Sequence, residues 1–358
     1  MTEIAATNVP WLPLYTIDRS GITEVEVYGI ISIVEGTASG GVKSLLRFGD
    51  VNYRLWSRSL LKPWQLLSHF REVVENYPQL NESHLTLMMS SHSAELTHLK
   101  LLDEIMSIGQ VSDELLKCPA TYPLANESRI QLKSEGQPPR SLYHNCSGKH
   151  FGYLMALKAA GHDMSKYTEP AAEHFVPLKE LLVDLTQRPE SDFEFATTDG
   201  CQLPNYSLSP QEMAVAYLKL ACGMKTENKR AMQLTELGEL MRAHPQVIGG
   251  VERFDSRLMG GLFADVDEVP VVAKEGADGL LGIGIGPNKK YPFGLGILIK
   301  LSSGNDTRHM QAITKEAFRQ LDILKHKREK AMIGPPVRKD HIKTNFNFEV
   351  SVSSAVQL

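Results

Sequence analysis

Apolar segments that favour strands lie at both ends of this chain. Near the N-terminus, Val25 to Gly36 is rich in β-branched residues and ends in glycine, and Leu45 to Leu55 follows it. Three short runs bounded by glycine lie toward the C-terminus, at Val269 to Ala273, Gly279 to Ile285 and Phe293 to Leu301. Such runs predict strands. Because helical patterns fill the middle, we expect one α/β (α+β) unit with a mainly antiparallel sheet and flanking helices.

The spacing of apolar residues predicts the helices between these ends. They are Trp64 to Tyr77, Ala94 to Ile108, Ser147 to Gly161, Ala171 to Leu185, Ser209 to Cys222, Asn228 to His244 and Asp306 to Leu324. Leu85 to Met89 is predicted to be a short strand, and residues 119–140 are predicted to be irregular. The tail from Asn345 to Val352 alternates polar and apolar residues, which predicts an edge strand. We expect a single catalytic unit over residues 1–358.

Composition excludes several classes of protein. A net charge of -4 without a basic stripe argues against a nucleic-acid partner. No apolar run reaches the roughly 20 residues that span a bilayer, and no signal peptide is recognisable at the N-terminus. Four unevenly spaced cysteines do not form a disulfide framework. We therefore expect a cytoplasmic protein without a membrane partner.

The first chemical motif is Ser-x-x-Lys, formed by Ser59 and Lys62. Residues three apart on a first helical turn share a face, so the amine can approach the hydroxyl. A serine becomes a good nucleophile when a neighbouring base takes its proton, and burial can lower the pKa of a lysine enough for this role. A helix start with a solvated lysine is the ordinary alternative. Pro63 also disfavours helical geometry at Lys62.

Two later elements strengthen the first one. Ser91 lies in Ser-Ser-His-Ser, between an apolar run and a helix, although a helix-capping serine would look the same. Lys274 lies in Lys-Glu-Gly, between two predicted strands. The order Ser-x-x-Lys, Ser, Lys-x-Gly is that of serine β-lactamases and penicillin-binding proteins. The shared order predicts one hydrolytic site.

A third group combines Cys146, Lys149 and Cys201. Two thiolates and a third donor can hold zinc and leave a position open to substrate or water, provided that the lysine amine is neutral. A cysteine nucleophile at a helix N-terminus is one alternative. Inert packed thiols are another, although Cys146 has polar and glycine neighbours.

For the turn Gly249 to Asp255, with its adjacent charges, a solvated loop is the default interpretation and an ordered loop near a site is the alternative.

Together these segments resemble the rhizobial-type (class 3) L-asparaginase family, also called asparaginase II. The resemblance runs from about Val25 to about Leu324, and its seven segments occur in the order of the family. They are RSLLKPWQ, SSHSAELTH, HNCSGKH, TDGC, GGVERFDSRLM, KEGADG and GLGILIK. Residues 325–358 lie outside the resemblance.

The resemblance implies a fold similar to serine β-lactamases and glutaminases, a homodimer, and hydrolysis of L-asparagine to aspartate and ammonia. It implies two Ser–Lys pairs, Ser59 with Lys62 and Ser91 with Lys274. It also implies a zinc site at the cysteines and lysine already named. His150 and Asp199 would line the substrate pocket. We add Arg58 as a partner for the substrate carboxylate.

The chain departs from the family pattern at several places. Ala94 and Gln202 stand where we expect glycine, and the turn Ser302 to Asp306 is less acidic than expected. Substrate preference therefore stays open. Glutamine is longer than asparagine by one methylene, which is worth only about 1–3 kcal/mol of discrimination.

Three other functions stay open as well. A glutaminase or another β-lactamase-like amide hydrolase would use the same fold. An amidase that depends on Cys146 would keep its activity without Ser59. A non-catalytic protein that binds an amino acid or zinc would be expected to lose at least one of the four residues of the Ser–Lys pairs, and all four are present.

Overall fold

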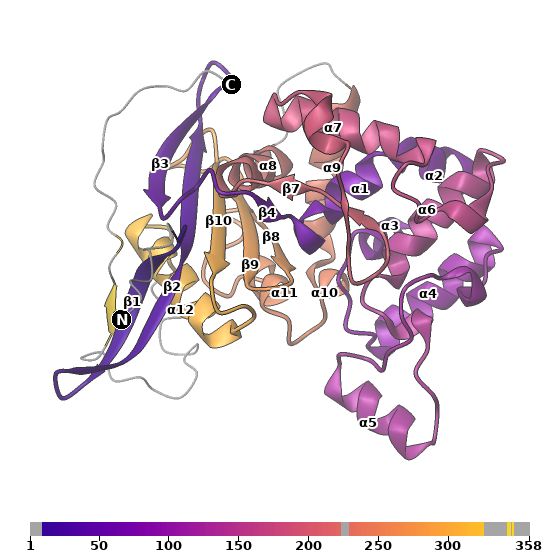
Figure 1. The fold of residues 1–358 in the computed structure, drawn as a ribbon, viewed down its shortest axis with the longest axis horizontal. Helices are drawn as coiled ribbons and strands as arrows, with labels where there is room; N and C mark the ends of the chain where they lie inside the picture. The colour runs from indigo at the N-terminus through magenta and orange to yellow at the C-terminus, as the bar shows by residue number, and fades with distance from the viewer. Residues whose placement is uncertain (1–8, 223–228, 326–341, 345, 347–358) are drawn as a thin grey trace, which may run out of the picture.

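The computed structural model describes residues 9–222, 229–325, 342–344 and 346. Its main sheet contains seven antiparallel strands in the order β11-β1-β2-β10-β9-β8, with β3 paired to β2. The strands are β1 Leu12–Arg19, β2 Ile22–Gly36, β3 Val42–Phe48, β8 Val271–Gly276, β9 Leu280–Ile285, β10 Leu295–Leu301 and β11 Ile342–Thr344. The two ends of the chain therefore meet in one sheet, as predicted (Figure 1).

Helix α8 (Pro210–Cys222) packs closely on the centre of this sheet, against β2, β9 and β10. Its start is fixed by a capping box, in which Ser209 N–H donates to Glu212 and Glu212 N–H donates to the Ser209 hydroxyl. Glycines in the strands make room for the helix. A Cβ at Gly296 would lie 1.9 Å from the Ala214 carbonyl oxygen, and one at Gly284 would lie 2.1 Å from that of Tyr217. The glycine-bounded strands are therefore suited to close helix packing.

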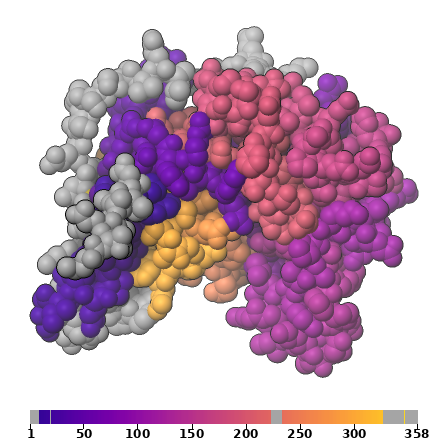
Figure 2. Space-filling view, in the orientation of Figure 1, coloured from indigo at the N-terminus to yellow at the C-terminus, as the bar shows by residue number. Residues whose placement is uncertain are grey.

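The middle of the chain forms a helical part beside the sheet (Figure 1). Its helices are α1 Lys62–Leu67, α2 Phe70–Asn76, α3 Glu82–Met88, α4 Leu96–Gly109, α5 Asn126–Ser134, α6 Ser147–Ala159, α7 Val176–Thr186, α9 Lys229–Ala243, α10 Pro245–Ile248 and α11 Phe254–Met259. Helix α12 (Thr307–Gln320) packs on β10. Figure 2 shows the helical part as a bulge that ends in the α5 region, with the surface hollowed between it and the sheet.

Short segments connect the two parts. The 3-10 turn η1 (Arg58–Leu61) leads into α1 and packs against β8 and β9. Two small sheets lie nearby, one of β4 (Leu55–Trp56) with β7 (Ser207–Leu208) and one of β5 (Thr197–Thr198) with β6 (Pro204–Asn205). The buried apolar side chains form one cluster that extends through the sheet and the helices. None of the described helices is long and apolar enough to cross a membrane.

Several local predictions were wrong. Leu85 to Met89 is not a strand, because most of it lies in α3. Asn81 accepts a hydrogen bond from His84 N–H, and the His84 ring accepts one from Asn81 N–H, so this pair starts the helix as a capping box. Residues 119–140, predicted as irregular, contain α5. The predicted helix from Trp64 to Tyr77 is broken between α1 and α2.

Two outcomes concern the ends of the chain. Strand β1 was not predicted, although it pairs with β2 along most of its length. The predicted strand from Asn345 to Val352 lies almost entirely outside the described residues. The edge strand that the structure does describe is β11, which pairs with β1.

Candidate active site

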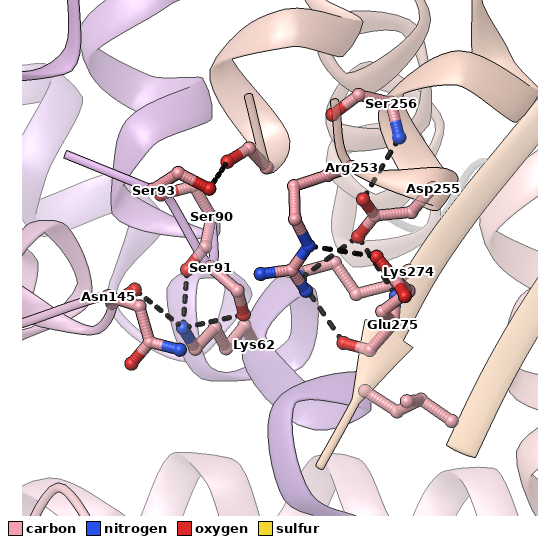
Figure 3. Close-up of polar contacts among 12 residues, drawn as sticks. Lys62, Ser90, Ser91, Ser93, Asn145, Arg253, Asp255, Ser256, Lys274 and Glu275 are labelled. Carbon is pink, nitrogen blue, oxygen red and sulfur yellow. Dashed lines mark hydrogen bonds and ion pairs between the residues drawn. The ribbon is translucent and has the colours of Figure 1, made fainter. Parts of the chain in front are cut away.

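Lys62 lies at the start of α1, and its side chain is fully buried between helices. Its amine contacts the Ser90 carbonyl oxygen, the Ser91 hydroxyl at 3.0 Å and the Asn145 carbonyl oxygen at 3.2 Å (Figure 3). Burial lowers the pKa of this amine. The expected conflict at Pro63 is resolved because η1 precedes α1 and the proline occupies the first turn, where it is tolerated.

The loop between α3 and α4 carries Ser91 and is fixed from its far side. Ser91 N–H donates to the Ile248 carbonyl at 2.7 Å, and the Ser93 hydroxyl donates to the Gly249 carbonyl at 2.7 Å. Ser91 is only 2% exposed. The loop therefore holds the Ser91 hydroxyl toward Lys62.

Lys274 comes from β8 and is also fully buried. Its amine lies 3.5 Å from Asp255 Oδ2 and 3.3 Å from the Glu275 carbonyl oxygen (Figure 3). Burial lowers the pKa of this amine to about 8, while the Asp255 carboxylate opposes that shift. This lysine therefore titrates much closer to neutral pH than an exposed one.

The charged segment before Lys274 is not a solvated loop. Asp255 is completely buried in α11, and Arg253 forms an ion pair of 2.9 Å with Glu275. The default interpretation of Gly249 to Asp255 was thus wrong, and the alternative of an ordered loop beside the site holds. The sequence shows adjacent charges but not the strand that supplies their partners.

The lysines contact different residues from those implied by the resemblance. The contacts of the Lys62 amine include Ser91 and not Ser59, and those of Lys274 include Asp255 and not Ser91. Lys62 extends from its helix toward the α3–α4 loop, which accounts for the difference. Ser59 is partly exposed on η1, and η1 packs on the strand that carries Lys274. The four residues thus surround the junction of η1, β8 and the α3–α4 loop.

The three predicted metal ligands lie together. Lys149 in α6 donates a hydrogen bond of 3.2 Å to Cys201 Sγ, and Cys146 caps the same helix. All three side chains are buried. A hydrogen bond from Cys201 and the nearby cations of Lys62 and Lys149 hold the pKa of Cys146 well below its usual range, despite burial. This thiol therefore favours its thiolate form.

This donor set fits a zinc ion in its chemistry. It offers a stabilised thiolate, a second thiol and an amine, and each must be deprotonated to bind metal. Burial lowers the pKa of the Lys149 amine, but the charges of Cys201 and Cys146 raise it by more, so the pKa lies above its ordinary value. A metal ion would therefore have to displace a proton from this amine. Among the described residues, no three His, Cys, Asp or Glu side chains form a metal cluster, so the site depends on the lysine.

Two of the three predicted substrate-binding residues contact each other. Arg58 Nε lies 2.9 Å from Asp199 Oδ1, and its terminal nitrogen contacts Asp278 in the β8–β9 turn. The resemblance and motifs gave no role to Asp278. His150 is fully buried in α6, where one ring nitrogen meets the Tyr167 hydroxyl at 2.6 Å and the other, Nε2, has no partner among the described residues.

Two of the three departures from the family pattern fall on unusual backbone positions. Ala94 has φ 54° and Gln202 has φ 74°, a left-handed conformation that favours glycine. Arg58, directly before Ser59, also has a positive φ of 49°. Backbone strain of this kind gathers at functional sites. The expected glycines thus have a physical reason, and this chain adopts the same conformation without them.

Comparisons with known proteins were made for the whole chain. A search of curated protein sequences gave no match. Among solved structures, a probable glutaminase from Bacillus subtilis complexed with 6-diazo-5-oxo-L-norleucine aligns at 12% identity and a TM-score of 0.39, covering 82% of this chain and 84% of that one. The carbapenemase VCC-1 from Vibrio cholerae aligns at 14% identity and a TM-score of 0.36, covering 83% and 95%.

The family comparison is much more extensive. The model of the family described as L-asparaginase II matches residues 15–345, which is beyond the resemblance on both sides. It covers every residue of the site described above. The chain therefore belongs to the L-asparaginase II family and is a hydrolase that acts on amides.

Proposed function

We propose that this protein hydrolyses the side-chain amide of L-asparagine through a serine nucleophile activated by lysine. The observation that carries the proposal is the buried Lys62 amine, which lies three residues after Ser59 and contacts Ser91. Membership of the L-asparaginase II family supports the substrate class. L-Glutamine is the competing substrate, because one methylene gives only modest discrimination.

In the proposed acylation step, the Ser59 oxygen attacks the amide carbon and the Lys62 amine takes the hydroxyl proton. The carbon–nitrogen bond then breaks, and the nitrogen leaves as ammonia after receiving a proton. In the deacylation step, a water molecule attacks the carbonyl carbon of the resulting ester. The ester bond to Ser59 then breaks, which releases aspartate and restores the serine hydroxyl. Splitting one difficult step into two is the advantage of a covalent nucleophile.

Ser91 and Lys274 would take part in the transfer of a proton to the leaving nitrogen. The Lys62 amine has two carbonyl oxygens and the Ser91 hydroxyl as partners, so a neutral amine can donate twice and accept the Ser91 proton. Ser91 would thus relay protons between Lys62 and the reacting groups. Lys274 would supply positive charge and a proton for the leaving nitrogen.

The thiol–lysine group would hold zinc through Cys146, Lys149 and Cys201. When bound, zinc would polarise a substrate oxygen or a water molecule. The contact of 3.2 Å between Lys149 and Cys201 supports this assignment, because it already brings two donors together. His150, one residue after Lys149, would face the substrate pocket.

Substrate selection would use the two charged residues beside Ser59. Arg58 is a suitable partner for the α-carboxylate, and Asp199 for the α-ammonium group. In the structure these side chains satisfy each other, with Asp278 as a further partner of Arg58. A bound amino acid would replace the Asp278 contact with its own carboxylate.

We further propose that the protein acts as a homodimer, which light scattering during gel filtration would test.

The direct test is ammonia release from L-asparagine and from L-glutamine, by the wild type and by Ser59→Ala, with and without added zinc. We expect release from asparagine by the wild type and near-total loss in the variant. Full activity in Ser59→Ala would move the nucleophile to another group, such as Cys146. No release from either substrate by the wild type would overturn the proposal and favour a binding protein.

A further inference from the structure

A fully buried ion pair and a partly exposed one lie side by side behind the site, where α11 packs on β8. Asp255 pairs with Lys274, and Arg253 pairs with Glu275 (Figure 3). Both members of the first pair have no exposed side-chain surface. A buried pair of this kind is rarely a net source of stability, because removing two charges from water is costly. Its presence beside a hydrolytic site therefore points to a role in the reaction.

The Asp255 carboxylate is fixed before it meets the lysine. Its Oδ1 accepts Ser256 N–H at 2.9 Å, and its Oδ2 accepts Glu275 N–H at 2.9 Å. Burial alone would raise the pKa of Asp255, but Lys274, Arg253 and the two backbone N–H groups together lower it. The carboxylate is therefore ionised and aimed at Lys274 from a rigid helix start.

We propose that Asp255 is a positioning residue that holds the Lys274 amine in place and keeps it protonated near neutral pH. The inference rests on the proposed amide hydrolysis, in which Lys274 supplies a proton to the leaving nitrogen. The Lys274 nitrogen–hydrogen bond breaks as the nitrogen–hydrogen bond of ammonia forms, and the amine regains a proton from solvent. Asp255 neither gives nor takes a proton in this step.

The charges around Lys274 assign the main part of this role to Asp255. Arg253 opposes protonation of Lys274, and so does Lys62 when it is protonated. Glu275 also favours protonation of Lys274, but less than Asp255 does, because its carboxylate is engaged with Arg253 and only its backbone carbonyl contacts the Lys274 amine. Tyr217 packs nearby from α8 and directs its hydroxyl to the Leu60 carbonyl. Removing Asp255 would take away the carboxylate that contacts the Lys274 amine and leave the weaker effect of Glu275 against the nearby cations.

The first experiment compares the pH profiles of kcat for the wild type, Asp255→Asn and Glu275→Gln. Activity that needs protonated Lys274 falls as the pH rises through about 8 in the wild type. In Asp255→Asn this alkaline limb should move down by about 1 to 3 pH units. At pH 8 we expect a loss of about fivefold or more that shrinks as the pH falls toward 6. Glu275→Gln, the matched carboxylate-to-amide control, should move the limb in the same direction but by less than Asp255→Asn, because Glu275 has the smaller effect on Lys274.

Two results would overturn the inference. An unchanged pH profile in Asp255→Asn would show that Lys274 does not need this carboxylate. An equal loss at every pH would show that Asp255 serves only packing. Asp255→Glu, which keeps the charge, should retain the alkaline limb near that of the wild type, and failure to do so would also count against the inference.

A second measurement does not depend on activity or on any change at Asp255. Lysine labelled with ¹³C at Cε gives an NMR signal that reports amine protonation, and Lys274→Arg identifies the signal of Lys274 by its loss. We expect the Lys274 amine of the wild type to be protonated at pH 7 and to titrate near 8. A neutral amine at pH 7 would refute the inference. Absence of ammonia release by the wild type would instead refute the proposed function and leave this titration valid.

Discussion

The helical part of the site and the adjacent sheet edge each bury one lysine, in different surroundings. The Lys62 amine contacts two carbonyl oxygens and the Ser91 hydroxyl, and burial lowers its pKa although the negative charge of Cys146 opposes that shift. The Lys274 amine contacts a carboxylate that is held by backbone N–H groups. Burial without a carboxylate partner favours an amine that gives up its proton, whereas a buried carboxylate favours one that keeps it. In the proposed mechanism, one site would thereby gain both a base and an acid from the same type of side chain.

The comparison is sharpest when each lysine is replaced by arginine, which stays charged at every accessible pH. Lys62→Arg cannot act as a base, so we expect kcat to fall by about 10²–10⁴-fold, the usual contribution of acid–base catalysis. Lys274→Arg keeps the positive charge but for the same reason cannot donate a proton, so kcat should also fall, and the decline near pH 8 should disappear because arginine does not titrate there. Steady-state ammonia release between pH 6 and 9 measures both.

Circular dichroism is the control for folding of these two variants. A decline near pH 8 that persists in Lys274→Arg would contradict the role of Lys274 as proton donor. Activity of Lys62→Arg close to that of the wild type would contradict the role of Lys62 as base.

The thiols of the proposed zinc site, Cys146 and Cys201, lie on the Lys62 side of the site. Among the described residues, the sheet edge that carries Lys274 has no such thiols. Cys201→Ser should weaken zinc binding by at least about 100-fold, because it removes a ligand and not merely a group that orients one. Competition with a chromophoric chelator gives the affinity. Cys222→Ser, which changes a thiol away from the site, is the matched control. Equal affinities in the two variants would remove zinc from this account.

The helical part should also be sensitive to acid pH. Burial lowers the pKa of His69 to about 3 and that of His98 to about 4, and both residues lie in the helical part. A folded-state pKa below the unfolded value gives stability that is full above about 6.5 and is lost as the pH falls. At pH 5 each histidine should cost about 2 kcal/mol relative to pH 7.5.

Urea unfolding at pH 7.5 and pH 5 tests this acid sensitivity. His69→Gln should reduce the difference between the two free energies of unfolding by about 2 kcal/mol. His162→Gln, at an exposed position, should leave the difference unchanged. If the wild type and both variants show the same difference in free energy of unfolding between pH 7.5 and pH 5, the helical part does not cause the acid sensitivity.

The smallest predicted effect concerns backbone strain near the thiols. Gln202 is exposed and has φ 74°, so Gln202→Gly should relieve about 1 kcal/mol of strain and raise Tm by about 2 °C. Gln131→Gly, within helix α5, should lower stability by about 1 kcal/mol. Differential scanning calorimetry compares the two. A lower Tm in Gln202→Gly would show that the glutamine side chain makes a contact worth more than the strain.

The sequence predicted β2, β8, β9 and β10 because these strands are apolar and bounded by glycine, whereas the predicted strand Leu45 to Leu55 overlaps β3 only at its start. It failed at Leu85 to Met89, since a short buried run fits a strand or a helix equally. The start signal there uses His84 where a capping box usually has glutamate or glutamine, so the box was not recognised. Strand β1, with two breaks in its register against β2, has no regular alternation to detect.

The site was predicted as a set of residues but not as a set of contacts. Motif order identifies Ser59, Lys62, Ser91 and Lys274, and it cannot tell which atoms meet in space. Asp255 escaped notice because adjacent charges ordinarily face solvent, and its partner lies on a strand much later in the chain. The exact partner of a buried charge depends on packing between elements, which local patterns do not encode.

The central claim is a covalent acyl intermediate on Ser59, and it can be observed directly. Wild-type protein mixed with L-asparagine is quenched in acid at early times, digested and mapped by mass spectrometry. We predict an aspartyl adduct on the peptide that contains Ser59, and its loss in Ser59→Ala. An adduct on the peptide with Ser91 or on the one with Cys146 would contradict the account.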